Sequence, residues 1–228
     1  MATFVLIHGA ADSAWYWHLV EPELRRRGHD VVTMDLPCDD DSAGLAEYAD
    51  TVVNAIDDHE GLVVVAQSFG GFTAPLVCDR VAVDLMVLLA AMIPSPGEAP
   101  KDYWTNTAWG GTRADQLDQA EDRGGEDAET IAAFMHDVPP DLAAEALKRT
   151  RYQSGTPGEQ PWPLPAWPDV PTRFLLCRDD RFFPADWMRR IAKERLGIVP
   201  DEIEGSHCVA LSRPKELTDR LEAYLNER

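Results

Sequence analysis

The sequence is poor in cysteine and has no metal-binding spacing. Its four cysteines, Cys38, Cys78, Cys177 and Cys208, form neither a C-x-x-C pair nor a zinc-type arrangement. Three of them adjoin apolar segments, which favours small buried side chains over disulfides or metal ligands. We therefore expect a reduced protein without a metal site.

Long hydrophobic runs are also absent. No stretch approaches the roughly 20 apolar residues that a membrane-spanning helix needs. The apolar run at the amino terminus covers only 4–7, and no basic segment precedes it, unlike the pattern of a signal peptide. We expect a cytoplasmic protein.

Basic residues are scarce, and nucleotide-binding motifs are missing. The chain has 21 lysines and arginines against 40 aspartates and glutamates, a formal net charge of −19. This balance disfavours nucleic acid, anionic membrane surfaces and strongly anionic substrates as partners. Neither G-x-G-x-x-G nor G-x-x-x-x-G-K-[ST] occurs, so dinucleotide binding and phosphate cradling lose their main support.

Apolar runs alternate with helical patterns in both the first and the last part of the chain. The predicted strands cover 4–7, 31–34, 62–67, 85–89, 172–177 and 202–204. The predicted helices cover 17–27, 45–56, 72–79, 185–196 and a last helix that Ser212 caps. This alternation predicts an α/β fold, with a mostly parallel sheet of about six strands and helices on both faces.

The alternation stops between 94 and 168. This segment is polar and acidic, with helical patterns near 128–136 and 141–149 and a proline-rich connector over 155–168. We expect a core formed by 1–93 and 169–228, with 94–168 inserted as a helical lid. Its tryptophans either pack the lid onto the core or form an aromatic wall around an apolar substrate: Trp104, Trp109, Trp162 and Trp167.

A serine between a buried strand and two glycines is the candidate nucleophile. The residues around Ser68 read A-x-S-x-G, close to the G-x-S-x-G nucleophile elbow. Such a tight turn requires small neighbours, which Ala66 and Gly70 provide. We expect the Ser68 hydroxyl to stand clear of the sheet, at the start of the next helix.

A histidine and an acid follow later strands in the order that this elbow requires. Ser68, Asp180 and His207 each come after a predicted strand, and Asp179 is the alternative acid. The carboxyl ends of parallel strands meet at one edge of a sheet, so we expect these side chains to converge. His207 would then remove the hydroxyl proton of Ser68, while Asp180 holds the imidazole in one tautomer.

The tetrahedral oxyanion of such a reaction needs two backbone donors. We expect the N–H groups of Ala10, after the first strand, and Phe69, directly after the nucleophile. His8 is predicted to shape the first loop without acting as a base, and Asp35 to cap a loop.

Taken together, these segments resemble the α/β-hydrolases of the plant methylesterase and hydroxynitrile lyase branch. The resemblance implies the α/β-hydrolase fold, a helical lid, a Ser68–Asp180–His207 triad and no cofactor. It covers both parts of the core, and the lid matches poorly. The matching stretches are 4–10, 14–17, 28–29, 35–36, 67–71, 178–181 and 207–214.

Two positions separate the lyases of this branch from its esterases. The lyases carry a threonine directly after the first-strand histidine and a lysine directly after the catalytic histidine, where this chain has Gly9 and Cys208. Without that lysine, no obvious cation holds a departing cyanide. Gln67 replaces the histidine common before the nucleophile, and this removes no catalytic group.

We therefore expect a serine esterase that hydrolyses a small, neutral or apolar ester through an acyl-enzyme on Ser68. Two alternatives stay open. One is a hydroxynitrile lyase-like or other carbon–carbon-cleaving enzyme on the same scaffold, and the other is a ligand receptor with vestigial hydrolase activity. The acyl and alcohol groups and the oligomeric state, a homodimer included, also stay open.

Overall fold

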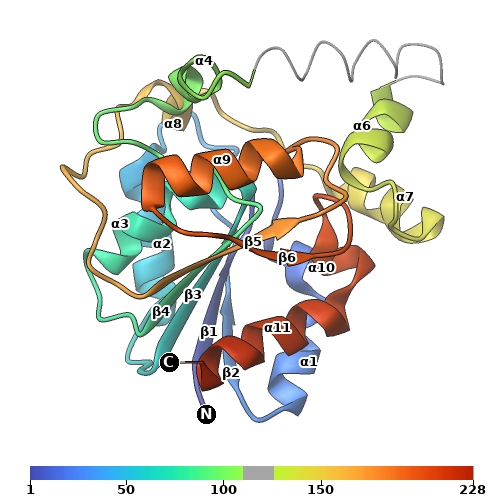
Figure 1. Ribbon diagram of the computed structural model, residues 1–228, viewed down its shortest axis with the longest axis horizontal. Helices are drawn as coiled ribbons and strands as arrows, with labels where there is room; N and C mark the ends of the chain where they lie inside the picture. Colours follow the sequence, from blue (N-terminus) through green and yellow to red (C-terminus); the bar gives the residue numbers. More distant parts are fainter. Residues whose placement is uncertain (110–125, 228) are drawn as a thin grey trace.

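The computed structural model describes residues 1–109 and 126–227, and its centre is one parallel sheet (Figure 1). Six strands lie in the order β2-β1-β3-β4-β5-β6, all parallel, which confirms the predicted sheet. They are β1 (Thr3–Ile7), β2 (Asp30–Thr33), β3 (Leu62–Gln67), β4 (Leu85–Leu89), β5 (Thr172–Cys177) and β6 (Asp201–Ile203).

The middle strands form because their residues are apolar on both faces. Every residue of β1, β3 and β4 is buried. Val64 of β3 lies opposite Val5 of β1 and Met86 of β4. A strand covered on both faces needs such a continuous apolar run, since neither face meets water.

Helices cover both faces of the sheet, as predicted (Figure 1). The first face carries α2 (Leu45–Ile56), α3 (Ala74–Cys78) and α9 (Ala185–Leu196). The second face carries α1 (Val20–Arg26), α10 (Val209–Ser212) and α11 (Pro214–Asn226).

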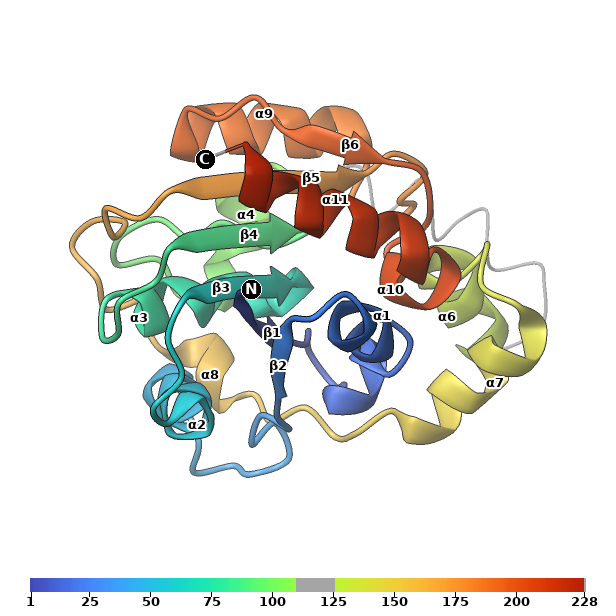
Figure 2. The same ribbon diagram turned by 90° about the horizontal axis from the view of Figure 1, so that it is seen from below.

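The described chain between β4 and β5 contains two longer helices and three shorter elements. Helices α6 (Glu126–Phe134) and α7 (Pro140–Arg149) lie beyond the carboxyl ends of the strands (Figure 2). Both were predicted, near 128–136 and 141–149. The shorter elements are η3 (Pro100–Asp102), α4 (Tyr103–Asn106) and α8 (Thr156–Glu159).

A buried ion pair fastens the start of this segment to the core. Arg195 of α9 donates from Nη2 to Glu98 Oε1 at 2.8 Å, and both side chains are largely buried. Glu98 also accepts hydrogen bonds from Asn106 and from the backbone N–H of Ser95. The division into 1–93, 94–168 and 169–228 remains a prediction, and residues 110–125 of the predicted lid lie outside the described residues.

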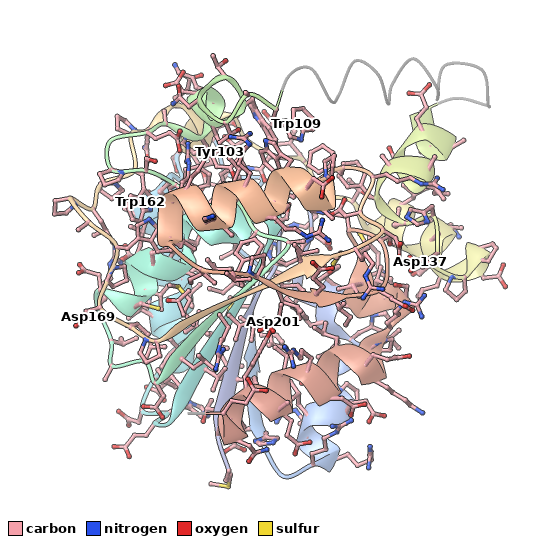
Figure 3. All side chains as sticks on the ribbon, in the orientation of Figure 1. Tyr103, Trp109, Asp137, Trp162, Asp169 and Asp201 are labelled. Atoms are coloured by element: carbon pink, nitrogen blue, oxygen red, sulfur yellow. The ribbon has the colours of Figure 1, made fainter. Side chains whose placement is uncertain are left out.

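The four tryptophans of this segment pack the chain together. Trp109 and Trp162 are buried, and their indole N–H groups donate to the carbonyls of Phe182 and Phe72, each at 3.1 Å (Figure 3). Trp167 donates to the Pro94 carbonyl at 3.0 Å. Trp104 packs against the core as well, 4.5 Å from the Trp109 ring, and also lines a cavity described below.

The last helix begins differently from the prediction. Ser212 ends α10 and does not cap α11, whose N-cap is Arg213 and whose first residue is Pro214. Proline suits the first helical position because its missing N–H would have no intrahelical partner there.

Two predicted α-helices also start later than expected, each after a short 3-10 turn. In place of 17–27, the turn η1 (Ala14–Trp17) precedes α1, which begins at Val20 and keeps Pro22 in its first turn. In place of 72–79, the turn η2 (Ser68–Phe72) precedes α3, which begins at Ala74.

Candidate active site

Ser68 sits at the sharp turn between β3 and η2 in a strained backbone conformation. Its φ is +52°, a value that L-residues other than glycine seldom adopt. The Ser68 carbonyl accepts a hydrogen bond from the N–H of Met92, after β4, at 2.9 Å. A Cβ on Gly70 would lie 3.0 Å from the His8 carbonyl oxygen, and one on Gly71 would overlap the Met92 carbonyl. The two glycines therefore allow the turn to press against its neighbours.

His207 and Asp180 form a buried pair at the ends of β5 and β6. The His207 Nδ1–H donates to Asp180 Oδ2 at 2.7 Å, and the two side chains are 4% and 1% exposed. Asp180 Oδ1 accepts the backbone N–H groups of Phe182 and Phe183, both at 2.8 Å. The carboxylate is thus held on both oxygens, and Nε2 of His207 is left as the basic nitrogen.

Asp179, the alternative acid, has a different role. Its Oδ2 accepts the backbone N–H of Gly205 at 2.9 Å, and its own N–H donates to the Gly205 carbonyl at 3.2 Å. These two bonds join the loop after β5 to the loop after β6. Asp179 therefore fastens the loop that carries His207 and makes no bond to the imidazole in the described part of the chain.

The end of α6 holds the His207 loop from the other side. The Cys208 N–H donates to the Phe134 carbonyl at 3.0 Å, and the Ser206 N–H donates to Asp137 Oδ2 at 3.2 Å. Asp137 lies where α6 and α7 meet the core (Figure 3). The position of the histidine thus depends on the segment between β4 and β5 as well as on the sheet.

One cavity of about 360 Å³ brings the candidate residues together. Ser68 and His207 line it with Ala10 and Phe69, while Asp180 lies behind His207. The size falls at the lower end of small-molecule pockets. The remaining walls are mainly apolar: Gly9, Ala11, Trp15, Met92, Trp104, Phe134, Met135, Ala146, Leu147, Phe182 and Leu211, with Asp12, Gln67, Thr130, Thr150 and Cys208 as other members.

The residues of the two predicted oxyanion donors, Ala10 and Phe69, both line this cavity. The N–H of Phe69 belongs to the first turn of η2, where an amide has no intrahelical partner. The next N–H after Ala10, that of Ala11, donates to Gln153 Oε1 at 3.0 Å, whereas the Ala10 N–H has no partner among the described residues. Their role as oxyanion donors stays a prediction.

His8 is buried and serves the loop, as predicted. Its Nε2 accepts the backbone N–H of Leu36 at 2.9 Å, and its Nδ1–H donates to the Gly9 carbonyl at 2.8 Å. Burial lowers the pKa of His8 to about 4, so the ring stays neutral at pH 7. Asp35 accepts the Ala14 N–H at 2.7 Å, which confirms its role as a loop cap.

Comparison with known proteins gives the family of the chain. A profile of the alpha/beta hydrolase family matches residues 4–220. The chain belongs to the alpha/beta hydrolase family. Norfluorocurarine synthase 1 of a Strychnos species is 24% identical over 96% of this chain and 93% of its own length. Methylesterase 9 of Arabidopsis thaliana is 23% identical over 97% of both chains.

A solved structure agrees with this alpha/beta hydrolase over nearly its whole length. The crystal structure of polyneuridine aldehyde esterase superposes with a TM-score of 0.82 at 21% identity, covering 98% of this chain and 99% of that one. The predicted fold and the predicted resemblance to the methylesterase branch are therefore confirmed.

At the two positions that distinguish the lyases, this alpha/beta hydrolase carries other residues, Gly9 and Cys208. A Cβ on Gly9 would lie 2.5 Å from Gln67 Oε1 and 3.0 Å from the Ser68 Cβ, so a threonine there would displace one of them. Gln67 in turn donates from Nε2 to the His207 carbonyl at 3.4 Å. Cys208 lines the cavity where the lyases have a lysine.

The cavity also contains an acid that the sequence reasoning did not single out. Asp12 lies in the loop after β1, two residues after Ala10, and burial raises the pKa of its carboxyl to about 6. Its Oδ1 accepts the N–H of Ser13 at 2.8 Å. An acid two residues after a predicted oxyanion donor was the available signal, but the small residues around it show no periodicity that would place it in the cavity.

Replacing Asp12 with asparagine should stabilise this alpha/beta hydrolase at pH 7.5. The native state binds the Asp12 proton more tightly than the unfolded chain does, so the free energy of unfolding falls as the pH rises from about 4 to 6. Removing the charge recovers about 2 kcal/mol at pH 7.5, less than the full shift because the side chain is partly exposed. Urea unfolding at pH 4 and 7.5 measures this.

The surface variant Asp40→Asn is the matched control, since that carboxylate bonds to Ser42 and the pKa of its carboxyl is lowered. A gain for Asp12→Asn that is as large at pH 4 as at pH 7.5 contradicts the assignment.

Neither a metal site nor a membrane span is found in the described residues. No group of three or more histidine, cysteine, aspartate and glutamate side chains in 1–109 and 126–227 could hold a metal ion. Over the same ranges, no helix is long and apolar enough to cross a membrane.

Proposed function

We propose that the protein is a carboxylesterase-type serine hydrolase acting on a small ester through an acyl-enzyme on Ser68. The observation that carries the proposal is one cavity lined by Ser68 and His207, with the imidazole bonded at 2.7 Å to buried Asp180. A serine at a strained turn, a histidine with a free basic nitrogen and an orienting carboxylate are the parts that acyl transfer requires.

In the proposed reaction, His207 Nε2 takes the proton of the Ser68 hydroxyl as Oγ bonds to the ester carbonyl carbon. The Ala10 and Phe69 N–H groups stabilise the negative charge on the carbonyl oxygen. The protonated imidazole, steadied by Asp180, then gives its proton to the departing alcohol as the carbon–oxygen bond breaks. Water then adds to the acyl carbon as His207 takes its proton, and the bond to Ser68 Oγ breaks as the imidazole returns the proton to Oγ, which releases the acid and the free enzyme.

Similarity to proteins named as esterases supports this reaction. A methylesterase of Arabidopsis and polyneuridine aldehyde esterase both match almost the whole chain. The small, mainly apolar cavity favours an ester of modest size. We propose further that segment 94–168 acts as the lid, because Phe134 of α6 and Leu147 of α7 contribute to the cavity wall. The cytoplasmic location, the excluded nucleic-acid and membrane partners and the homodimer stay predictions.

A serine-reactive fluorophosphonate probe tests the proposal. We expect one adduct per chain, found by mass spectrometry on the peptide that contains Ser68, and loss of p-nitrophenyl acetate hydrolysis in step with labelling. Ser68→Ala should carry no adduct, and Ser42→Ala, at an exposed serine bonded to Asp40, should label fully. Hydrolysis without an adduct on Ser68 would contradict the mechanism, while neither labelling nor hydrolysis would favour the ligand receptor.

A further inference from the structure

Asp12 stands out among the residues of the catalytic cavity because of its charge. Within the described residues that line the cavity, it is the single acid, and no lysine or arginine is present. The neighbouring wall is apolar, formed by Ala11, Trp15 and Leu211. A carboxylate in such a place is costly unless a counter-charge joins it.

Among the described residues, no lysine or arginine is bonded to the Asp12 carboxylate. One oxygen of Asp12 accepts the Ser13 N–H at 2.8 Å, and the side chain makes no other hydrogen bond in the described part of the chain. The guanidinium of Arg151 lies near, but it donates to Asp39 Oδ1 at 2.7 Å and to the Leu36 carbonyl at 2.9 Å. The second carboxylate oxygen of Asp12 is therefore left for a ligand.

We propose that the ester substrate carries a cationic ammonium group, which Asp12 binds while Ser68 attacks the carbonyl. This inference rests on the proposed function. The net charge of −19 attracts cations to the protein and repels anions. Aromatic side chains line the same cavity, with Trp104 and Phe182 among them, and aromatic rings are favourable neighbours for an ammonium group.

A cation is already placed against one of these rings. The guanidinium carbon of Arg149, on α7, lies 4.9 Å from the centroid of the Trp15 ring. Arg149 is bonded to Glu145 at 2.8 Å, so its charge is compensated on the surface. His18 stacks on the same ring at 4.2 Å, so Trp15 already has its ring partners and the ligand's positive group is left to Asp12.

Two acetate esters of nearly equal shape provide the test. Acetylcholine carries a permanent positive charge, and 3,3-dimethylbutyl acetate is its neutral carbon counterpart. We expect the ratio of kcat/KM for the cationic ester to that for the neutral ester to be about tenfold lower in Asp12→Asn than in the wild type. Because both esters react at the same centre, a general loss of catalytic power cancels in the ratio.

The pH dependence of the same ratio gives a second readout. Asp12 has a raised pKa of about 6, so the wild-type ratio should fall as the pH drops from 8 to 5, and the Asp12→Asn ratio should stay flat. The charged or titratable neighbours that act on Asp12 or share its surroundings are Asp35, Arg151, Tyr16, Cys208 and His207.

Asp40→Asn removes the same charge from the surface and should leave the ratio at its wild-type value. A wild-type ratio near one, unchanged by Asp12→Asn, overturns the inference even if p-nitrophenyl acetate is hydrolysed and Ser68 is labelled. Failure of both the hydrolysis and the labelling is instead a failure of the proposed function. Measurable hydrolysis of the neutral ester by Asp12→Asn shows that the variant is folded.

Discussion

Ser68→Ala should lower kcat for p-nitrophenyl acetate by about 10⁴- to 10⁶-fold. The substitution removes the one oxygen that forms the acyl-enzyme and leaves the rest of the cavity in place. The Cβ remains, so the turn between β3 and η2 and its contacts with His8 and Met92 need not change. A stopped assay with the purified variant at high protein concentration measures the residual rate.

Stability separates the loss of a nucleophile from the loss of a fold. Ser68→Ala should melt within a few degrees of the wild type. Ser68→Gly should be as inactive as Ser68→Ala. Its free energy of unfolding should be higher than that of Ser68→Ala by about 1 kcal/mol, because glycine adopts a φ of +52° without steric cost. Activity of Ser68→Ala within tenfold of the wild type would remove Ser68 from the mechanism. The exposed Ser42→Ala is the matched control.

The strained turn at Ser68 explains why the sequence alone predicts the nucleophile. An elbow needs a serine, small residues on either side and a strand before it, and all of these lie within ten consecutive residues, 62–71. Local patterns of this kind, and the period of apolar residues along strands and helices, depend on few distant contacts. The sheet, α6, α7 and Ser68 could therefore be predicted.

Features set by distant contacts could not be predicted. The bond from the Ser206 N–H to Asp137 joins residues 69 positions apart, and the one from the Cys208 N–H to the Phe134 carbonyl joins residues 74 apart. No periodicity marks either pair. The place of Asp12 in the cavity depends in the same way on how the first loop meets α7, since Ala146 and Leu147 line the same cavity.

The choice between the two acids after β5 could be predicted only in part. The sequence places Asp179 and Asp180 side by side at a strand end, and both could reach a histidine on the next loop. Only the folded backbone distinguishes them. The turn aims the N–H groups of Phe182 and Phe183 at Asp180 Oδ1, which leaves Oδ2 toward His207.

This difference predicts opposite outcomes for two neighbouring variants. Asp180→Asn should lower kcat for p-nitrophenyl acetate by about 10⁴-fold, because an amide that donates to the imidazole puts the His207 proton on the wrong nitrogen. Asp179→Asn should lose less than about tenfold, because the asparagine oxygen can still accept the Gly205 N–H that now bonds to Asp179 Oδ2.

Steady-state rates of both variants from pH 6 to 9 decide between the two acids. Both substitutions remove one negative charge within one residue of each other, so a general electrostatic effect would lower the two rates alike. A large loss confined to Asp180→Asn identifies the carboxylate that orients His207. If Asp179→Asn were the weaker enzyme, the pair seen at 2.7 Å would not be the one that acts during turnover, and the loop after β5 would have to rearrange when substrate binds.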